Sequence, residues 1–379
     1  MIARQDMRTM INQTISDVIR TLKLCTGKVQ MNRRMMLQTT ISAALLGGTG
    51  VFSAAHAAAA NSSEILKPKR LAPGDTIGLV APASSSLEDE GIRISIDVVR
   101  SLGFKVREGS HLYDRQQYLA GEDRARADDV NAMFADDGVD AIFCLRGGYG
   151  TPRILPYLDY DLIRSRPKVL LGMSDITGIL TAIHTKTGVV GFHGPNSSSS
   201  FSDYSLNEFK KVLVRPTPTT QIGAAPTFET GEGKVDKKNR LTHINGGTAK
   251  GRLIGGNLTL ISVLMGTEFE PDFQDRIVFL EDVHEAPYRI DRMLTQLRLA
   301  GKLQQAAGIV FGKFTDSETD GNTFSLEEVF RDRTADLGIP VVRGLMIGHV
   351  RDQTVVPIGI EAELNGDAGT LRLLEPAVS

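Results

Sequence analysis

The sequence of 379 residues contains no tryptophan, only two cysteines and few aromatic residues, which make up 6% of the chain. Its formal net charge is −2, and it has neither a basic tail nor a stripe of alternating basic and aromatic residues. These absences argue against a nucleic acid as a partner. The rest of the composition, 41% hydrophobic and 23% charged, is typical of a globular α/β protein of about two domains.

The sequence also lacks an apolar run long enough to make a good membrane span. The most apolar stretch runs from Ile41 to Phe52, is rich in glycine, follows the pair Arg33 and Arg34, and precedes the small-x-small site Ala55-His-Ala57. Paired arginines, a short apolar core and such a site predict a twin-arginine-like export signal. We therefore expect a periplasmic protein cleaved near Ala57, without an integral membrane span in the mature chain.

Two alternatives to this export stay open. The signal could remain uncleaved as an anchor, and the protein would be cytoplasmic if the signal were not functional. Residues 1–30 are unusual in front of a signal, and a start at Met31 would make it conventional. Removal of residues 1–57 takes away seven Lys/Arg and two Asp/Glu, so the formal charge moves from −2 to −7. Only Cys144 then remains, inside an apolar run, where a lone cysteine is an inert small hydrophobe.

Beyond residue 65 the pattern predicts strands that alternate with helices, which is typical of a parallel sheet covered on both faces. The predicted strands are 76–81, 105–108, 141–145 and 169–172, and the predicted helices are 90–102, 123–135, 152–158 and 174–187. A polar stretch interrupts this rhythm, and a second α/β pattern begins at Gly251. The domain prediction is an extension with signal at 1–60, an N-terminal α/β domain at 66–200, a linker region at 201–250 and a C-terminal α/β domain at 251–379.

The apolar run at Val169–Gly172 is followed by Ser174 and then by a helical pattern. A nucleophile elbow consists of a strand, a tight turn that carries the serine, and a helix. This segment has that order, although Ile176 stands where the second glycine of G-x-S-x-G is expected. In such a turn, the hydroxyl stands above the sheet edge and the amide of Asp175 points at a developing oxyanion. The alternative is that Ser174 only caps the helix.

Two further strand ends carry groups that could act with Ser174. The strand Ile277–Leu280 ends in Glu281 and Asp282, and Leu345–Gly348 is followed by His349. Ligands and catalytic groups collect at the carboxyl ends of strands in open α/β sheets. A serine, an acid and a histidine from three strands can meet in space as a catalytic triad. We expect the site in the cleft between the two domains.

These motifs, taken in order from about residue 68 to about residue 375, make the chain resemble the LD-carboxypeptidase family of serine peptidases, which includes muropeptide LD-carboxypeptidases and microcin C immunity proteins. The segments that carry the resemblance are Gly74–Ser84 (GDTIGLVAPAS), Leu145–Gly150 (LRGGYG), Gly172–Thr177 (GMSDIT), His193–Pro195 (HGP), Gly255–Leu258 (GGNL), Leu280–Val283 (LEDV), Pro287–Arg292 (PYRIDR) and Gly348–His349. The resemblance implies that Ser174 is the nucleophile, Glu281 the acid and His349 the general base. It also implies a homodimer.

By the same resemblance, the activity is release of the terminal D-Ala from a murein tetrapeptide, by cleavage of the L,D peptide bond through an acyl-enzyme on Ser174. Two alternatives remain. A microcin C-like hydrolase of an aminoacyl nucleotide would favour an aromatic platform for adenine, best made by the tryptophan that this chain lacks. A non-catalytic periplasmic peptide-binding protein would also have two α/β domains, a cleft and an export signal.

The remaining candidates surround the predicted triad. Gly147 or Gly148 is expected to supply the second oxyanion donor beside Asp175. Arg146, Asn257 and His193 are candidates for substrate contact, although Asn257 could equally be a helix N-cap. His284 has no second histidine four residues on, so no metal site is expected. No cofactor is predicted.

Overall fold

The computed structural model describes residues 64–379 except 320 and 322. The predicted export signal therefore lies outside the described residues. Everything described below belongs to one compact unit, Ser63–Ser379. Within the described residues, none of the helices combines the length and the apolar character that crossing a bilayer requires.

The first of two β-sheets forms from the alternating pattern of the N-terminal half. Its five parallel strands are β1 (Thr76–Val80), β2 (Lys105–Glu108), β3 (Ala141–Cys144), β4 (Val169–Gly172) and β5 (Phe192–His193). The order across the sheet is β12-β5-β4-β3-β1-β2, where β12 (Val356–Pro357) is antiparallel to β5. All residues of β3 and β4 are buried, as expected for central strands covered on both faces.

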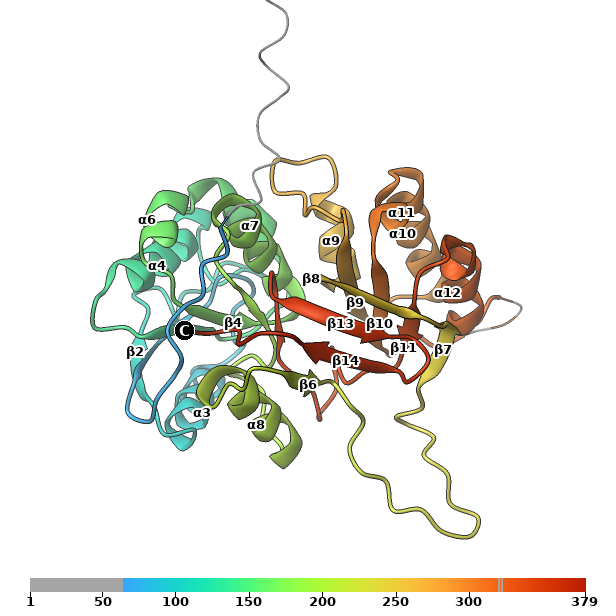
Figure 1. Ribbon diagram of the computed structural model, residues 1–379. Helices are drawn as coiled ribbons and strands as arrows, with labels where there is room; N and C mark the ends of the chain where they lie inside the picture. Colours follow the sequence, from blue (N-terminus) through green and yellow to red (C-terminus); the bar gives the residue numbers. More distant parts are fainter. Residues whose placement is uncertain (1–63, 320, 322) are drawn as a thin grey trace, which may run out of the picture. The chain divides into compact units, whose positions relative to one another are not determined.

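The helices of this half connect the parallel strands. They are α3 (Asp89–Ser101), α4 (Asp123–Ala135), α5 (Thr151–Ile154), α6 (Tyr160–Ser165) and α7 (Thr177–Thr187). In α3 the residues Ile92, Ile96 and Val99 recur at helical spacing and are buried, which gives the helix one apolar face for the sheet. Helices α4, α6 and α7 lie on one side of the sheet and α3 on the other (Figure 1). The predicted α/β fold with a parallel N-terminal sheet is confirmed.

The second sheet has eight strands in the order β6-β14-β13-β8-β9-β10-β11-β7. Its parallel centre consists of β8 (Thr248–Asn257), β9 (Arg276–Val283), β10 (Gly308–Thr315) and β11 (Val341–Arg343). The antiparallel flanks are β6 (Thr220–Ile222), β7 (Thr242–Asn245), β13 (Glu361–Asn365) and β14 (Thr370–Leu373). Its helices are α9 (Leu258–Leu264), α10 (Pro287–Leu299), α11 (Lys302–Gln305) and α12 (Leu326–Thr334). These helices lie on the same side of the sheet (Figure 1).

The polar stretch 201–250, predicted as a linker, contains regular structure. It includes α8 (Asp203–Phe209), a π-helical turn (Lys210–Val214), and the strands β6 and β7 at the two edges of the second sheet. Between these two strands runs a long exposed loop that extends away from the sheet (Figure 1). The exact domain boundaries stay a prediction.

Candidate active site

Ser174 lies on a sharp turn between β4 and α7. The strand ends at Gly172, Met173 is extended, and Ser174 has a φ of 65°. This left-handed conformation costs a non-glycine residue about 1–3 kcal/mol and persists only where surrounding contacts enforce it. The serine side chain caps neither the following 3₁₀ turn nor α7, so it does not have the helix-capping role that was the alternative to a nucleophile.

Hydrogen bonds on both sides hold this turn in place. Before it, the Met173 amide donates to Asn196 Oδ1 at 3.0 Å. After it, the buried Asp175 carboxylate accepts from the Thr151 amide at 2.8 Å, and the Thr151 hydroxyl donates to the Asp175 carbonyl. Burial raises the pKa of Asp175 above its usual value, although the bonds from Thr151 oppose this. The Asp175 side chain is therefore engaged in the turn, and its amide is left for another role.

The glycine loop after β3 approaches the serine closely. A Cβ atom placed on Gly147 would lie 2.7 Å from Ser174 Cβ, 3.0 Å from Ser174 Oγ and 3.1 Å from the Asp175 amide nitrogen. Only a glycine leaves room for the serine side chain there. Gly148 has a φ of 120° and packs against Ser84 instead, with a hypothetical Cβ 2.6 Å from Ser84 Cβ. Of the two candidate oxyanion donors, Gly147 is the one that contacts Ser174.

Glu281 and His349 form a direct pair. His349 Nδ1 lies 2.7 Å from Glu281 Oε2. Glu281 comes from β9 and is fully buried, whereas the His349 side chain keeps 22% of its surface exposed. The preceding Gly348, with a φ of 114°, makes this approach possible, because a Cβ there would lie 2.6 Å from Glu281 Oε2. The contact uses Nδ1 and leaves Nε2 of the imidazole for another partner.

The charges of this pair stabilise each other. Burial by itself would raise the pKa of Glu281, but His193 and His349 outweigh it and hold that pKa at about 2. Burial by itself would lower the pKa of His349, but the hydrogen bond and the charge of Glu281 raise it above the ordinary 6.5. Glu281 is thus ionised across the physiological pH range, and it favours the protonated imidazole.

His193 lies on the other side of the same carboxylate. Its Nε2 is 3.5 Å from Glu281 Oε1, and both atoms are buried without a hydrogen-bond partner among the described residues. The His193 ring packs edge-on against Phe279 and is 1% exposed. Sequence reasoning proposed His193 as a substrate contact near the cleft. The structure buries it beside Glu281, and a side-chain contact between a two-residue strand of one sheet and β9 of the other leaves no local sequence signal.

Asp282, the carboxylate next to Glu281, faces different partners. It accepts from Asn257 Nδ2 at 2.8 Å, from the Thr259 amide at 3.0 Å and from the Thr259 hydroxyl at 2.9 Å. Burial raises the pKa of Asp282, and the charge of Glu281 raises it further. Asp282 therefore anchors the start of α9 and does not contact the imidazole.

Asn257 is the N-cap of α9, which is one of the two roles expected for it. Its Oδ1 accepts from the Leu260 amide at 3.2 Å, and the residue is buried. The backbone amide of Asn257 donates to Thr177 Oγ1 at 3.0 Å. Asn257 is also in register with Glu281 in the β8–β9 ladder. The bond from Asn257 to Thr177 holds the end of β8, and with it the neighbouring β9, at the start of α7, three residues after Ser174.

A second connection, through His193, links the end of β4 to β9. His193 is in register with Gly172 at the end of β4, and it faces Glu281 at the end of β9. The turn with Ser174 and the Glu281–His349 pair are therefore both adjacent to His193, where β5 of the first sheet faces β9 of the second. Arg146 lies half-buried beside this region, with its guanidinium 3.4 Å from the Ser85 carbonyl oxygen.

Comparisons with known proteins identify the family of this chain. The sequence matches the LD-carboxypeptidase N-terminal domain over residues 77–194 and the LD-carboxypeptidase C-terminal domain over residues 250–364. A probable murein peptide carboxypeptidase of Bacillus subtilis is 40% identical over 316 residues, which cover 83% of this chain and 95% of the relative.

Solved structures show the same fold. The muramoyltetrapeptide carboxypeptidase from Oxalobacter formigenes has a TM-score of 0.67 and 31% identity, covering 79% of this chain and 97% of its own. The microcin C7 self-immunity protein in the wild-type apo state has a TM-score of 0.75 and 26% identity, covering 83% of this chain and all of its own. The chain belongs to the LD-carboxypeptidase family and is a carboxypeptidase of the serine type.

Proposed function

We propose that this enzyme releases the terminal D-Ala of a murein tetrapeptide, with Ser174 as nucleophile, His349 as general base and Glu281 as the acid. The observation that carries the proposal is the Glu281–His349 pair at 2.7 Å, together with a serine on a left-handed turn at the end of β4, the strand whose last residue is in register with His193 beside Glu281. The murein substrate is supported by the names of the 40% identical Bacillus relative and of the Oxalobacter structure.

In the first step Ser174 Oγ attacks the carbonyl carbon of the L,D peptide bond. His349 takes the hydroxyl proton on Nε2, because Nδ1 faces Glu281. The ionised Glu281 fixes the imidazole tautomer and stabilises the imidazolium that forms. His349 then gives the proton to the leaving amine of D-Ala, and an acyl-enzyme remains on Ser174. In the second step, His349 activates a water that hydrolyses the ester.

The negative charge that develops on the carbonyl oxygen needs hydrogen-bond donors. The Asp175 amide is one, since it follows the nucleophile at the start of a helical turn. The loop at Gly147 supplies the second, and its close packing on Ser174 and on the Asp175 amide supports this assignment. Neither donor needs a side chain, so both are set in place by the backbone of the two turns.

The direct test is to incubate the purified protein with murein tetrapeptides and to measure free D-Ala. We expect release by the wild-type protein and none by Ser174→Ala. Release by Ser174→Ala above a few per cent of the wild-type rate would remove this serine from the nucleophile role. A chelator such as EDTA should have no effect on the rate.

A microcin C-like aminoacyl nucleotide is the second candidate substrate, because the immunity protein has the same fold at a TM-score of 0.75. The higher identity to the murein enzymes and the absence of tryptophan for stacking on adenine favour the peptide. Both substrates offered to the same preparation would decide, with the larger kcat/KM identifying the substrate.

We also propose that the protein is exported to the periplasm through the arginine pair Arg33 and Arg34, and that the mature enzyme is a homodimer. Changing both arginines to lysine should keep the precursor in the cytoplasm, because the twin-arginine route reads the pair and not charge alone. N-terminal sequencing should find the mature end near Ala58. An uncleaved cytoplasmic protein beginning at Met31 would contradict export, and a monomeric mass in solution light scattering would contradict the dimer.

A further inference from the structure

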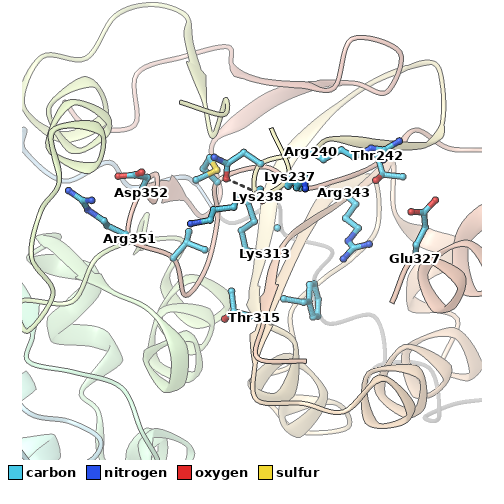
Figure 2. Close-up of a pocket in the computed structure, with 16 residues that line it drawn as sticks. Lys237, Lys238, Arg240, Thr242, Lys313, Thr315, Glu327, Arg343, Arg351 and Asp352 are labelled. Carbon is cyan, nitrogen blue, oxygen red and sulfur yellow. Dashed lines mark hydrogen bonds between the residues drawn. The ribbon is translucent and has the colours of Figure 1, made fainter. Parts of the chain in front are cut away.

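A pocket of about 630 Å³ opens in the second half of the structure, outside the residues assigned above. Its walls come from the segment before β7, from the ends of β10 and β11, and from the loop after His349. Figure 2 shows Lys237, Lys238 and Lys313 close together in the middle of this pocket, with Arg351 on one side and Arg343 on the other. The volume is within the range of sites that bind small ligands.

The lining of this basic pocket is strongly cationic. Six of its side chains are Lys237, Lys238, Arg240, Lys313, Arg343 and Arg351, against the acids Glu327 and Asp352. Among the described residues, none of the six cations has a carboxylate within 4.0 Å, and Glu327 pairs with Arg331 outside the pocket. From residue 58 onward, however, the chain carries a net negative charge. Six cations that outnumber the acids around them and form no ion pair with any residue that the structure describes, in a protein of net negative charge, indicate a site for an anionic ligand.

Two of these cations are held in the pocket by the fold itself. Lys313 lies on β10, and its Nζ donates to the Lys238 carbonyl at 3.3 Å and to Asn239 Oδ1 at 3.4 Å, both neutral acceptors. Arg343 ends β11 with its guanidinium 5.3 Å from the Phe330 ring centroid. Burial lowers the pKa of both side chains. Their charges are thus partly desolvated, and the carboxylates that act on them, Asp236 for Lys313 and Glu327 for Arg343, lie beyond 4.0 Å. An anionic ligand in direct contact would offset this cost.

The basic pocket shares a wall with the proposed general base. Two lining residues flank His349 in the sequence: Val350 follows it directly, and Met346 lies three residues before it. Thr315 also lines the pocket, and its hydroxyl donates to the His349 carbonyl at 3.4 Å. A ligand in the pocket is therefore adjacent to the segment that carries the imidazole.

We propose that the basic pocket binds the free carboxylates of the substrate peptide on the acyl side of the scissile bond. This inference rests on the proposed function, because a peptide acylated on Ser174 must run past His349. The departing D-Ala carries a single carboxylate, which requires neither six cations nor a volume of about 630 Å³. The three residues on the acyl side of a tetrapeptide can supply several carboxylates at once if they are acidic. Arginine and lysine bind such groups through charge-assisted hydrogen bonds.

Two synthetic peptides test this proposal. Both are tetrapeptides that end in D-Ala, and they differ only at one acidic residue upstream of the scissile bond, whose carboxylate is either free or amidated. We expect the wild-type enzyme to prefer the free acid by about tenfold or more in kcat/KM, since each near-surface charge pair contributes a few-fold. The variant Lys237→Gln/Arg240→Gln should lose about tenfold on the free acid and nothing on the amide.

The matched control removes the same charge elsewhere. Lys105 on β2 and Arg215 after the π-helical turn are exposed, do not line the pocket and have no ion pair among the described residues. The variant Lys105→Gln/Arg215→Gln should keep the wild-type preference. Equal rates on the two peptides, or an equal loss on both in the pocket variant, would overturn the proposal while leaving the carboxypeptidase activity intact.

Calorimetric binding to Ser174→Ala separates this inference from the proposed function. The free-acid peptide should bind about tenfold more weakly when Lys237→Gln/Arg240→Gln is added to that variant. If the wild-type enzyme released no D-Ala from either peptide, the proposed function would fail, and this measurement would still decide about the pocket. Unchanged binding in the pocket variant, or tighter binding of inorganic phosphate than of the peptide, would overturn the inference.

Discussion

Glu281→Gln is the substitution that tests most of the proposed mechanism. The change keeps the size of the side chain and removes its charge from a site that is fully buried, 2.7 Å from His349 Nδ1. The amide of glutamine can also turn its donor toward Nδ1, which would favour the wrong tautomer of the imidazole. The folded site would remain, but the imidazolium would lose its counter-charge.

The expected loss in kcat is large. The equivalent change of aspartate to asparagine in a Ser-His-Asp triad costs about 10⁴-fold, and a loss of about 10³–10⁴-fold is expected here. Stability should fall as well. The pKa of Glu281 at about 2, against its usual 4.5, corresponds to about 3 kcal/mol of stabilisation that is present above pH 4.5 and is lost as the pH falls toward 2.

The pH dependence gives a second readout. His349 acts as a base only when neutral, so kcat/KM of the wild-type enzyme should rise with pH through a pKa above 6.5. Without the charge of Glu281, that pKa should fall and the acid limb of the profile should move to lower pH. The stabilisation that the charged imidazole gives has the opposite sign: it is fully present below pH 6.5 and is lost as the pH rises through the raised pKa.

Asp282→Asn is the matched control, one residue away. It removes the charge that accepts from Asn257 and Thr259 at the start of α9, so thermal stability should fall by about 1–3 kcal/mol. The acid limb of the pH profile should move much less than in Glu281→Gln. A larger loss of kcat in Asp282→Asn than in Glu281→Gln, or an acid limb that does not move in Glu281→Gln, would refute the assignment of Glu281.

Substitutions at three positions address the rest of the site. Ser174→Gly should abolish D-Ala release. Its free energy of unfolding should exceed that of Ser174→Ala by about 0.5–1 kcal/mol, because glycine accepts the φ of 65°. A clearly less stable glycine variant would show that the turn is not strained. Gly147→Ala should lower kcat at least tenfold with little change in far-UV circular dichroism, because its Cβ would lie 3.0 Å from Ser174 Oγ, and full activity would place the loop away from the serine. His193→Phe should lower kcat about 10–100-fold and move the acid limb to higher pH, because a Glu281 carboxylate that is no longer shared with His193 holds the His349 imidazolium more strongly. His193→Gln, which keeps a donor, should recover part of both effects, and identical pH profiles in the two variants would leave His193 with a packing role alone.

The ends of β4 and β9 were the most predictable part of the site, whereas the third predicted strand end was wrong. Leu345–Gly348 forms no strand, because Gly344 and Gly348 with positive φ interrupt the extended backbone, and His349 lies in a loop after β11. Long apolar runs such as Val169–Gly172 and Ile277–Leu280 are central strands that are buried whichever neighbours they have, so their position follows from the local sequence. The groups that follow them, Ser174 and Glu281, could therefore be placed at strand ends from the sequence alone. Cys144 was also expected to be an inert buried residue, and burial indeed raises the pKa of its thiol.

Features that depend on distant partners were not predictable. The strands β5, β6 and β12 have two or three residues and no periodicity, and they exist because they pair with strands far along the chain. The burial of His193 against Glu281 depends on one of these short strands. The basic pocket was missed for the same reason, since its cations are spread over more than a hundred residues of sequence.

The two sheets also exchange edge strands, and this has a consequence for how the chain could be cut. β6 precedes the long exposed loop and joins the eight-stranded sheet, whereas β12 follows that loop and joins the six-stranded sheet. A protease that nicked the loop near Gly233 would leave two fragments, each with a strand hydrogen-bonded into the other's sheet. These two exchanged strands should hold the fragments together without a covalent bond. The nicked enzyme should therefore elute as one particle in gel filtration. The nucleophile and the acid–base pair would then lie on separate polypeptides. Activity would require that the two fragments associate, which is the property that a split-protein reporter uses.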